Sequence, residues 1–230
     1  GVTAVDITLQ PDGSRTNSVL PAESISLAAF GGNAFSVASF GAFLAVGTQA
    51  GYVFLFDVSA APPVLVASRF VGQTVNHVVF APGGTKVYAM LENRIDALDE
   101  NGAVVGPGNV FVLRVSTLAV KLVSDVGFFP LHSATLLNQY LYITNVGGEL
   151  WSIDTTMDTF ASLGPLIVPG SLSGIVASTN IFVGNQSAGE IQIVRTGRTP
   201  SSDNIDGKVS LPSGSAPFGI AAIPRIKGKP

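Results

Sequence analysis

The sequence predicts an all-β fold: a single β-propeller of five blades, with the last blade closed by both chain termini. Two observations support this prediction. A short segment recurs five times at intervals of about 40 to 55 residues, close to the length of a four-stranded blade. Further short apolar stretches follow each copy, and none keeps a helical period over the roughly 11 residues needed to indicate a helix. The alternative is a β-sandwich, and repeats of blade length argue against it.

The clearest copy of the repeated unit lies between Leu136 and Asp154. An alternating strand at 140–144 is followed by a glycine-containing turn at 145–148 and a second strand at 150–154. A strand, a tight glycine turn and a second strand form the signature of a β-hairpin. We therefore expect a blade to be a series of such hairpins.

The recurring segment is predicted to be the innermost strand of each blade. Its five copies are Phe35-Ser36-Val37-Ala38, Asn76-His77-Val78-Val79, Leu131-His132-Ser133-Ala134, Leu172-Ser173-Gly174-Ile175 and Phe218-Gly219-Ile220-Ala221. A second, a third and a weaker fourth apolar segment follow, which is typical of a blade whose outer strand is an exposed edge. The predicted blades cover residues 31–73, 74–128, 129–170, 171–214, and 215–230 together with 1–30. Residues 91–108 contain an Asn101-Gly102 turn and are predicted to form an inserted hairpin in the second blade.

Composition limits the classes of function. Only 12% of the 230 residues are charged and the net charge is −3, which argues against a nucleic-acid partner. There is no cysteine, so disulfides and thiolate chemistry are excluded, and no apolar run approaches the roughly 20 residues of a membrane span. Few charges and many small polar residues favour a secreted or surface-exposed protein. Because the chain begins at Gly1 without a methionine, we expect a mature product or an excised piece.

One stretch resembles a known repeat. Tyr142-Ile143-Thr144-Asn145, followed after the turn by residues 149–154, resembles the propeller family named for its Tyr-Val-Thr-Asn (YVTN) signature, and Pro217-Phe218-Gly219-Ile220-Ala221 is similar to the segment that opens those repeats. The resemblance is clear in two blades, whereas Ala45-Val46-Gly47 departs from it. The family, which typically has more than five blades, includes surface-layer and secreted binding proteins as well as lactonase-like and quinoprotein-like enzymes, so the resemblance implies a fold and no particular chemistry. The Gly-His and Trp-Asp marks of WD repeats are absent.

The two histidines of the chain are the strongest candidates for a functional site. His77 and His132 occupy the same position of neighbouring copies of the recurring segment, where the others carry Ser36, Ser173 and Gly219. We expect these positions to surround one mouth of the central channel, with Asn76 beside them. Two imidazoles could hold a divalent metal or act as an acid–base pair. A catalytic zinc site takes about three protein ligands, however, so histidines bonded to backbone or water are the competing interpretation.

Other candidate motifs are weaker. The acidic residues end the third strands (Asp6, Asp57, Asp154), where we expect them to accept backbone hydrogen bonds in turns rather than to act in a glycosidase. Two acidic clusters lack the spacing of a calcium loop and are predicted to be solvated turns: Asp96, Asp99 and Glu100, and Asp203, Asn204 and Asp206. Asn185-Gln186-Ser187 fits a glycosylation acceptor on an exposed hairpin.

Taken together, these features predict a non-catalytic recognition propeller, extracellular or surface-exposed, that presents loops and binds a protein or glycan at its channel mouth or at the inserted hairpin 91–108. The candidate ligand-binding residues are His77, His132, Ser36, Ser173 and Asn76. The alternative is a metal-assisted lyase or hydrolase that uses His77 and His132 to hold a divalent metal. A third hypothesis makes the chain one module of a larger assembly.

Overall fold

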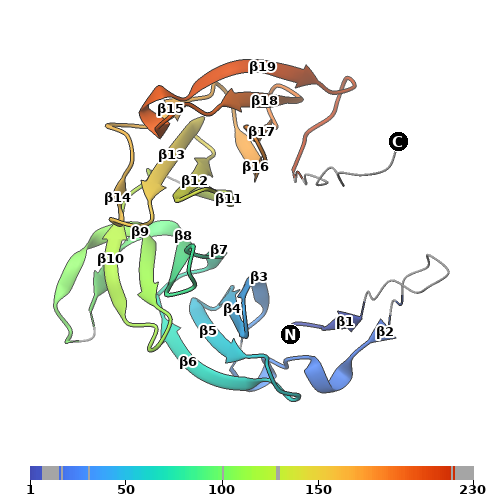
Figure 1. Cartoon of the computed structure of the whole chain (residues 1–230), viewed down its shortest axis with the longest axis vertical. Helices are drawn as coiled ribbons and strands as arrows, with labels where there is room; N and C mark the ends of the chain where they lie inside the picture. The colour runs from blue at the N-terminus through green and yellow to red at the C-terminus, as the bar shows by residue number, and fades with distance from the viewer. Residues whose placement is uncertain are drawn as a thin grey trace.

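The computed structural model describes residues 1–6, 16, 18–30, 32–99, 101–127, 130–218 and 220, with the side chains of 130–133 left outside this description. Within these residues the regular structure consists of antiparallel strands and three short 3-10 helices. Four larger sheets follow one another along an arc, and a two-stranded sheet lies at its N-terminal end (Figure 1). No helix among the described residues is long and apolar enough to cross a membrane.

Each larger sheet is a meander in which neighbouring strands follow one another along the chain. The first sheet contains β3 (Ala34–Phe40), β4 (Phe43–Thr48), β5 (Tyr52–Asp57) and β6 (Val64–Phe70). The second contains β7 (Val75–Phe80), β8 (Lys86–Leu98), β9 (Val104–Arg114) and β10 (Val120–Ser124). The third contains β11 (Pro130–Leu137), β12 (Tyr140–Asn145), β13 (Glu149–Asp154), β14 (Thr159–Phe160) and β15 (Leu166–Ile167). The fourth contains β16 (Leu172–Ala177), β17 (Ile181–Asn185), β18 (Glu190–Arg195) and β19 (Asn204–Ser210).

The first strands of the four sheets lie on the concave side of the arc. β3, β7, β11 and β16 are neighbours in succession there (Figure 1). In each sheet the register between the first and second strands shifts at the recurring segment, for example between Ala34 and Ser36 and between Val75 and His77. A bulge at this point redirects the side chain that follows it. The segments that recur in the sequence are therefore equivalent positions in space.

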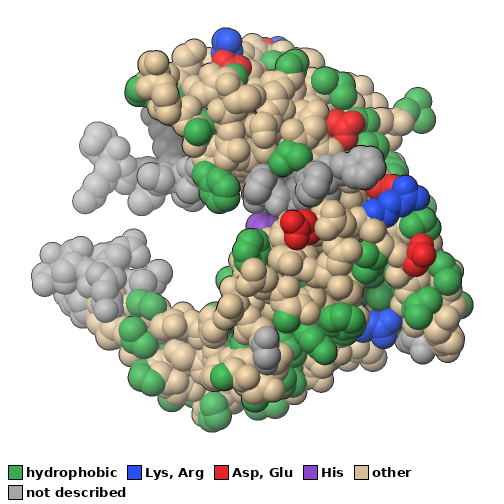
Figure 2. All heavy atoms as spheres, turned by 180° about the vertical axis from the view of Figure 1, so that it is seen from behind, with side chains coloured by type: hydrophobic (Ala, Val, Ile, Leu, Met, Phe, Trp, Pro, Cys, Tyr) green, Lys and Arg blue, Asp and Glu red, His purple; other side chains and the backbone are tan. Residues whose placement is uncertain are grey.

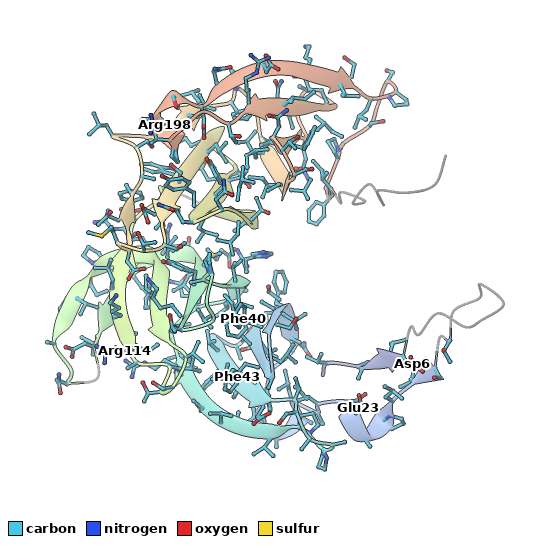
Figure 3. All side chains as sticks on the ribbon, viewed as in Figure 1. Asp6, Glu23, Phe40, Phe43, Arg114 and Arg198 are labelled. Atoms are coloured by element: carbon cyan, nitrogen blue, oxygen red, sulfur yellow. The ribbon has the colours of Figure 1, made fainter. Side chains whose placement is uncertain are left out.

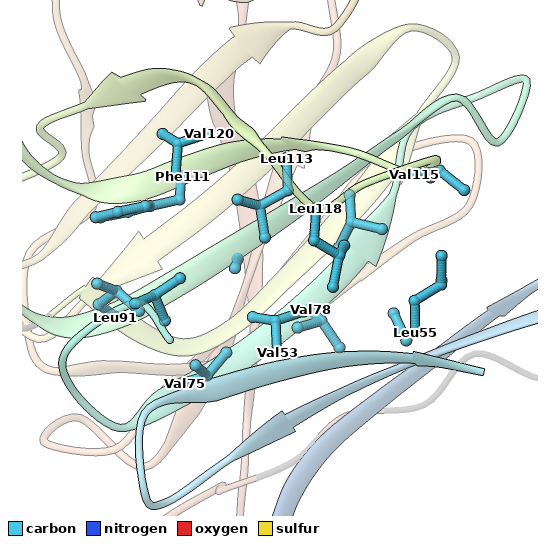
Figure 4. Packing of buried hydrophobic residues seen from close by; sticks show 14 of the residues in the cluster. Val53, Leu55, Val75, Val78, Leu91, Phe111, Leu113, Val115, Leu118 and Val120 are labelled. Atoms are coloured by element: carbon cyan, nitrogen blue, oxygen red, sulfur yellow. The ribbon is translucent and has the colours of Figure 1, made fainter. Parts of the chain in front are cut away.

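The hydrophobic core lies between consecutive sheets. Between the first and second sheets, Val53 and Leu55 of β5 pack with Val78 of β7 and with Phe111 and Leu113 of β9 (Figure 4). Similar clusters lie between the second and third sheets and between the third and fourth. Because both faces of a middle sheet are covered, its second and third strands are nearly continuous apolar runs.

The hairpin of β8 and β9 is longer than the others, as Figure 1 shows. Its extension is the segment at 91–108, and it packs against the first sheet. Ala97 is buried in the cluster between these sheets, and Arg69 Nη2 of β6 donates a hydrogen bond of 2.8 Å to the Leu98 carbonyl. The extension therefore covers the outer part of the interface between two sheets.

The outer edge of the third sheet is broken. The fourth strand predicted for each blade is divided here, because β14 ends at Phe160 and β15 begins at Leu166. Both short strands pair with β13. Pro165 lies in the interruption and has no amide hydrogen to donate to β13. The interruption bends the chain away from β13.

The N-terminal segment covers the free face of the first sheet. β1 (Val5–Asp6) pairs with β2 (Ser18–Val19), and Val2 bridges to Ile25. Ile25 and Leu27 pack there on Phe54 and other residues of the first sheet. Of the predicted closing strand, only Phe218 and Ile220 belong to the described residues, and its pairing with the N-terminal strands lies outside them. Closure of the last blade by both termini thus stays a prediction.

Candidate functional site

His77 lies on β7, on the concave side of the arc. Burial lowers the pKa of its imidazole, and a hydrogen bond to the backbone of Ala134 on β11 opposes that shift. The neutral form is therefore favoured near pH 7. The hydrogen bond engages one of the two ring nitrogens. The side chain of His132 lies outside the described residues, so the predicted histidine pair remains a prediction.

A cavity of about 560 Å³ opens beside His77. Its walls come from the first and second sheets and from the C-terminal segment, and they are formed by Phe35, Gln49, Thr74, Asn76, His77, Glu92 and Phe218. Figure 2 shows the histidine colour at the indentation of the concave side, on a surface with few charged groups. The cavity thus brings together two amides, a hydroxyl, a carboxylate, an imidazole and two phenyl rings.

The two predicted serines form hydrogen bonds within the protein. Ser36 Oγ accepts a hydrogen bond of 3.0 Å from the amide of Val78 on the next sheet. Ser173 is fully buried, and its hydroxyl lies 2.5 Å from the Pro217 carbonyl oxygen. Neither serine lines the cavity beside His77. Ser36, His77 and Ser173 thus each bond to the backbone of the next inner segment along the concave side.

Metal ligands do not gather among the described residues: no three histidine, aspartate or glutamate side chains lie close enough there to hold an ion. Asp99 of the first acidic cluster accepts hydrogen bonds from the amides of Asn101 and Ala103. In the second cluster Asp206 pairs with Arg195. Glu100 lies outside the described residues.

Comparison with known proteins identifies the architecture. No family model and no curated protein matches the chain. Solved structures match it at 9–13% identity: a chain of a mitotic checkpoint complex (TM-score 0.62, 80% of this chain and 53% of that one, 9% identity), the β-propeller domain of Cps50 (Swd1) from Myceliophteria thermophila (0.61, 87% and 62%, 13%) and the Pan2 WD40 domain from Neurospora crassa (0.56, 79% and 51%, 12%).

The chain has the β-propeller fold. The four larger sheets are blades, and the two-stranded sheet brings the number of sheets to five. At such low identity the likeness concerns the fold alone. The chain spans little more than half of the first structure and about three fifths of the second. The resemblance to the YVTN type remains a prediction, because no family model matches.

The asparagine of the Tyr-Ile-Thr-Asn stretch fastens a blade to its connector. Asn145 is buried, its Nδ2 donates to the Val126 carbonyl at 3.1 Å, and its Oδ1 accepts from the Glu149 amide at 3.0 Å. Asn185 does the same in the next blade by donating to the Pro169 carbonyl. The signature is thus structural at these two positions.

Burial of Asn185 also corrects one expectation. We expected the Asn185-Gln186-Ser187 triplet to be exposed, but the asparagine side chain is fully buried and its Oδ1 accepts from Ser187 Oγ. A glycan attached to Nδ2 would displace the hydrogen bond to Pro169. The prediction of an exposed glycosylation acceptor at Asn185 is therefore wrong for the folded protein.

The carboxylates at the third-strand ends behave as expected in two blades. Asp57 Oδ1 accepts hydrogen bonds from the amide and hydroxyl of Ser59, and Asp154 Oδ1 accepts the same pair from Thr156. These contacts confirm the predicted turns. They lower the pKa of Asp57. Burial raises the pKa of Asp154, but the contacts from Thr156, together with hydrogen bonds from Gln139 and the Met157 amide, lower it below its ordinary value.

Two aspartates connect neighbouring blades: the sequence analysis did not single out Asp158, and it expected Asp203 to lie in a solvated turn. Tyr88 on the second blade donates to Asp158 Oδ1 at 2.5 Å, and Tyr142 on the third blade donates to Asp203 Oδ2 at 2.7 Å. Each aspartate belongs to the loop between the third and fourth strands of the following blade. The signal in the sequence was a tyrosine at the same place in two second strands.

The environment of Asp158 is strongly cationic. Its carboxylate lies 2.6 Å from Lys86 Nζ on one oxygen and 2.6 Å from Lys121 Nζ on the other. Burial raises the pKa of Asp158, but the hydrogen bonds from Lys121, Lys86 and Tyr88 together hold it below its ordinary value. Removing a buried charge from such a group is costly, because its partner is left buried without a counter-charge.

Proposed function

We propose that this propeller is a non-catalytic recognition module that binds an extended segment of another protein in the cavity beside His77. The cavity has the character of a binding surface, because it is concave, partly apolar and furnished with a few polar groups. The observation that carries the proposal is the exposure of two aromatic side chains in it. Phe35 is 59% exposed and Phe218 is 68% exposed.

The polar groups of the cavity suit a peptide backbone. The amides of Gln49 and Asn76 can each donate and accept a hydrogen bond, while the Glu92 carboxylate can accept from an amide or a hydroxyl. A large apolar side chain of the partner would lie against the Phe35 ring. Removing exposed phenyl surface from water favours binding by roughly 25 cal/mol per Å².

Replacement of Phe35 by alanine tests this proposal. We expect the Phe35→Ala protein to bind a selected peptide at least tenfold more weakly, because the aromatic contact is lost while the exposed position leaves the fold intact. Peptides would be selected on an array with the wild-type protein and measured by calorimetry. Val64→Ala is the matched control, since Val64 is 57% exposed on the outer strand of the same blade.

Equal affinity in wild type, Phe35→Ala and Asn76→Ala would contradict binding at this cavity. A glycan array run beside the peptide array covers the other ligand class, and selective glycan binding with no peptide binding would contradict the choice of a protein partner. The low charge of the chain supports our further proposal of a secreted or surface location. Analytical ultracentrifugation would show whether the module self-associates.

A metal-assisted lyase or hydrolase is the rival function, and one observation favours it. The hydrogen bond to the Ala134 backbone engages one nitrogen of His77 and orients the ring, as is usual for a histidine that binds a metal. Elemental analysis of purified protein would decide. We expect no stoichiometric metal in the wild-type protein. One equivalent of zinc or another divalent metal in the wild type, lost in His77→Ala, would establish the metal-assisted enzyme instead.

A further inference from the structure

The interface between the third and fourth blades contains a second cavity, of about 310 Å³. It lies where the outer edge of the third blade is interrupted between β14 and β15. Its apolar walls come from leucine and proline side chains: Leu150, Leu163, Pro165, Leu166 and Pro200. Its polar groups are Tyr142, Ser152, Ser162, Ser201 and Asp203.

Within the described part of the chain, the hydrogen-bond donors to Asp203 are neutral. Its Oδ2 accepts from the Tyr142 hydroxyl at 2.7 Å, and its Oδ1 accepts from the Gly197 amide at 2.8 Å. Among the described residues no lysine or arginine forms an ion pair with it. Arg198, which Figure 3 labels on the same loop, is exposed and is not such a partner. Each carboxylate oxygen can still accept a further hydrogen bond.

The interface between the second and third blades contains the same tyrosine–aspartate pair, and there two lysines neutralise the carboxylate. There the Tyr88–Asp158 pair is joined by the ammonium groups of Lys86 and Lys121, each 2.6 Å from the carboxylate. Strand register identifies the equivalent positions one blade later. Tyr140 takes the place of Lys86, because each begins the second strand of its blade and pairs with the last residue of the third strand. Ala161 takes the place of Lys121, because each follows the residue that pairs with the next-to-last residue of the third strand.

One blade later, therefore, the tyrosine and the carboxylate are retained and both ammonium groups are missing. Burial accordingly raises the pKa of Asp203, only partly offset by Gly197 and Tyr142, whereas the pKa of Asp158 is lowered. A carboxylate in a cavity attracts a cation, because its charge is costly to bury without one.

We propose that the cavity between the third and fourth blades binds an alkylammonium group, with the ammonium on Asp203 and the aliphatic chain against the leucine and proline walls. The serine hydroxyls accept the remaining N–H groups. Both a lysine side chain of a partner and a small free amine carry this chemistry. The site lies in a different interface from the cavity beside His77 and does not depend on the function proposed above.

Titration of ¹⁵N-labelled wild-type protein with n-butylammonium, followed by NMR, tests the site directly. We expect saturable shifts of amides around Tyr142, Leu150 and Ser201. The neutral isostere n-butanol should bind at least tenfold more weakly, because it lacks the charge. Nα-acetyl-lysine methylamide distinguishes the sources: tighter binding than butylammonium indicates a lysine side chain, and equal or weaker binding indicates a free amine.

Asp203→Asn should weaken butylammonium binding at least tenfold, since asparagine keeps the hydrogen bond to Tyr142 and loses the charge. Asp206→Asn is the control, because that exposed carboxylate on β19 pairs with Arg195, and it should leave binding unchanged. Absence of saturable binding, equal binding of butanol, or unchanged binding in Asp203→Asn would overturn the proposal. The comparison of butylammonium with butanol requires no variant and holds even if Asp203→Asn does not fold.

Discussion

Replacing Asp158 with asparagine is expected to lower the free energy of unfolding by about 3–5 kcal/mol, the largest effect of any single substitution considered for this propeller. Asparagine preserves the shape of the side chain and an acceptor for Tyr88. It removes the negative charge that Lys86 and Lys121 share. The Lys86 side chain is only 14% exposed, so its ammonium group would remain in the interface without a counter-charge.

Lys121→Met should cost much less than Asp158→Asn. The Lys121 side chain is 44% exposed, so its charge is screened by solvent, and Lys86 still neutralises the carboxylate when Lys121 is removed. Asp206→Asn, which removes an exposed carboxylate, should change stability by less than about 1 kcal/mol. Urea denaturation of the four proteins measures these differences. An Asp158→Asn effect no larger than that of Asp206→Asn would mean that the cluster does not hold the blades together.

The Asp158 contribution should also depend on pH in a defined direction. The pKa of this carboxyl is lowered in the folded protein, so the folded state releases its proton more readily than the unfolded chain does. Its stabilising effect is complete above the unfolded value of about 3.9 and is lost as the pH falls through the lower folded value. The stability difference between wild type and Asp158→Asn should therefore shrink below about pH 4.

Replacing Asn145 with alanine is expected to cost about 3 kcal/mol, the second largest effect. The substitution leaves the Val126 carbonyl and the Glu149 amide in the interface without the side chain that satisfies them. Asn185→Ala should cost a similar amount, because its side chain bonds to the Pro169 carbonyl and the Ala188 amide. Thermal or urea unfolding measures both.

Asn204→Ala is the matched control for these two variants. Asn204 begins the outer strand β19 and is exposed, so its loss should change stability by no more than about 0.5 kcal/mol. If Asn145→Ala and Asn204→Ala were equally stable, the hydrogen bonds of the signature asparagine to the connector would not contribute to stability. The first blade offers a natural comparison, because Thr48 performs a related task there by bonding to the backbone of Tyr52.

Much of the fold could be predicted because its signals are local. Alternating residues and a glycine turn mark the hairpin of β12 and β13, and the equivalent pattern recurs in each blade. The turns ended by Asp57 and Asp154 were predictable for the same reason, since the acceptor and donors are two residues apart. The break in the outer strand of the third blade was missed, although Pro165 could have indicated it.

The candidate site was less predictable, because its side chains come from different blades. The recurrence of Ser36, His77 and Ser173 indicated equivalent positions, but not that the two serines would bond to backbone groups of the following segment. The Tyr88–Asp158 and Tyr142–Asp203 contacts join residues 70 and 61 positions apart. No local pattern links partners at such separations, and only the recurring tyrosine pointed to them.

The sequence by itself determined the strand order, the length of the repeat and the face of each strand that is buried, because hydrophobic periodicity and turn chemistry act over a few residues. Only the tertiary structure decided which polar groups meet between blades. That outcome depends on how one sheet packs on the next. Two lysines neutralise the Asp158 carboxylate at one interface, whereas the Asp203 carboxylate lines a cavity at the next. Repeats that look alike in sequence thus acquire different chemistry at their interfaces.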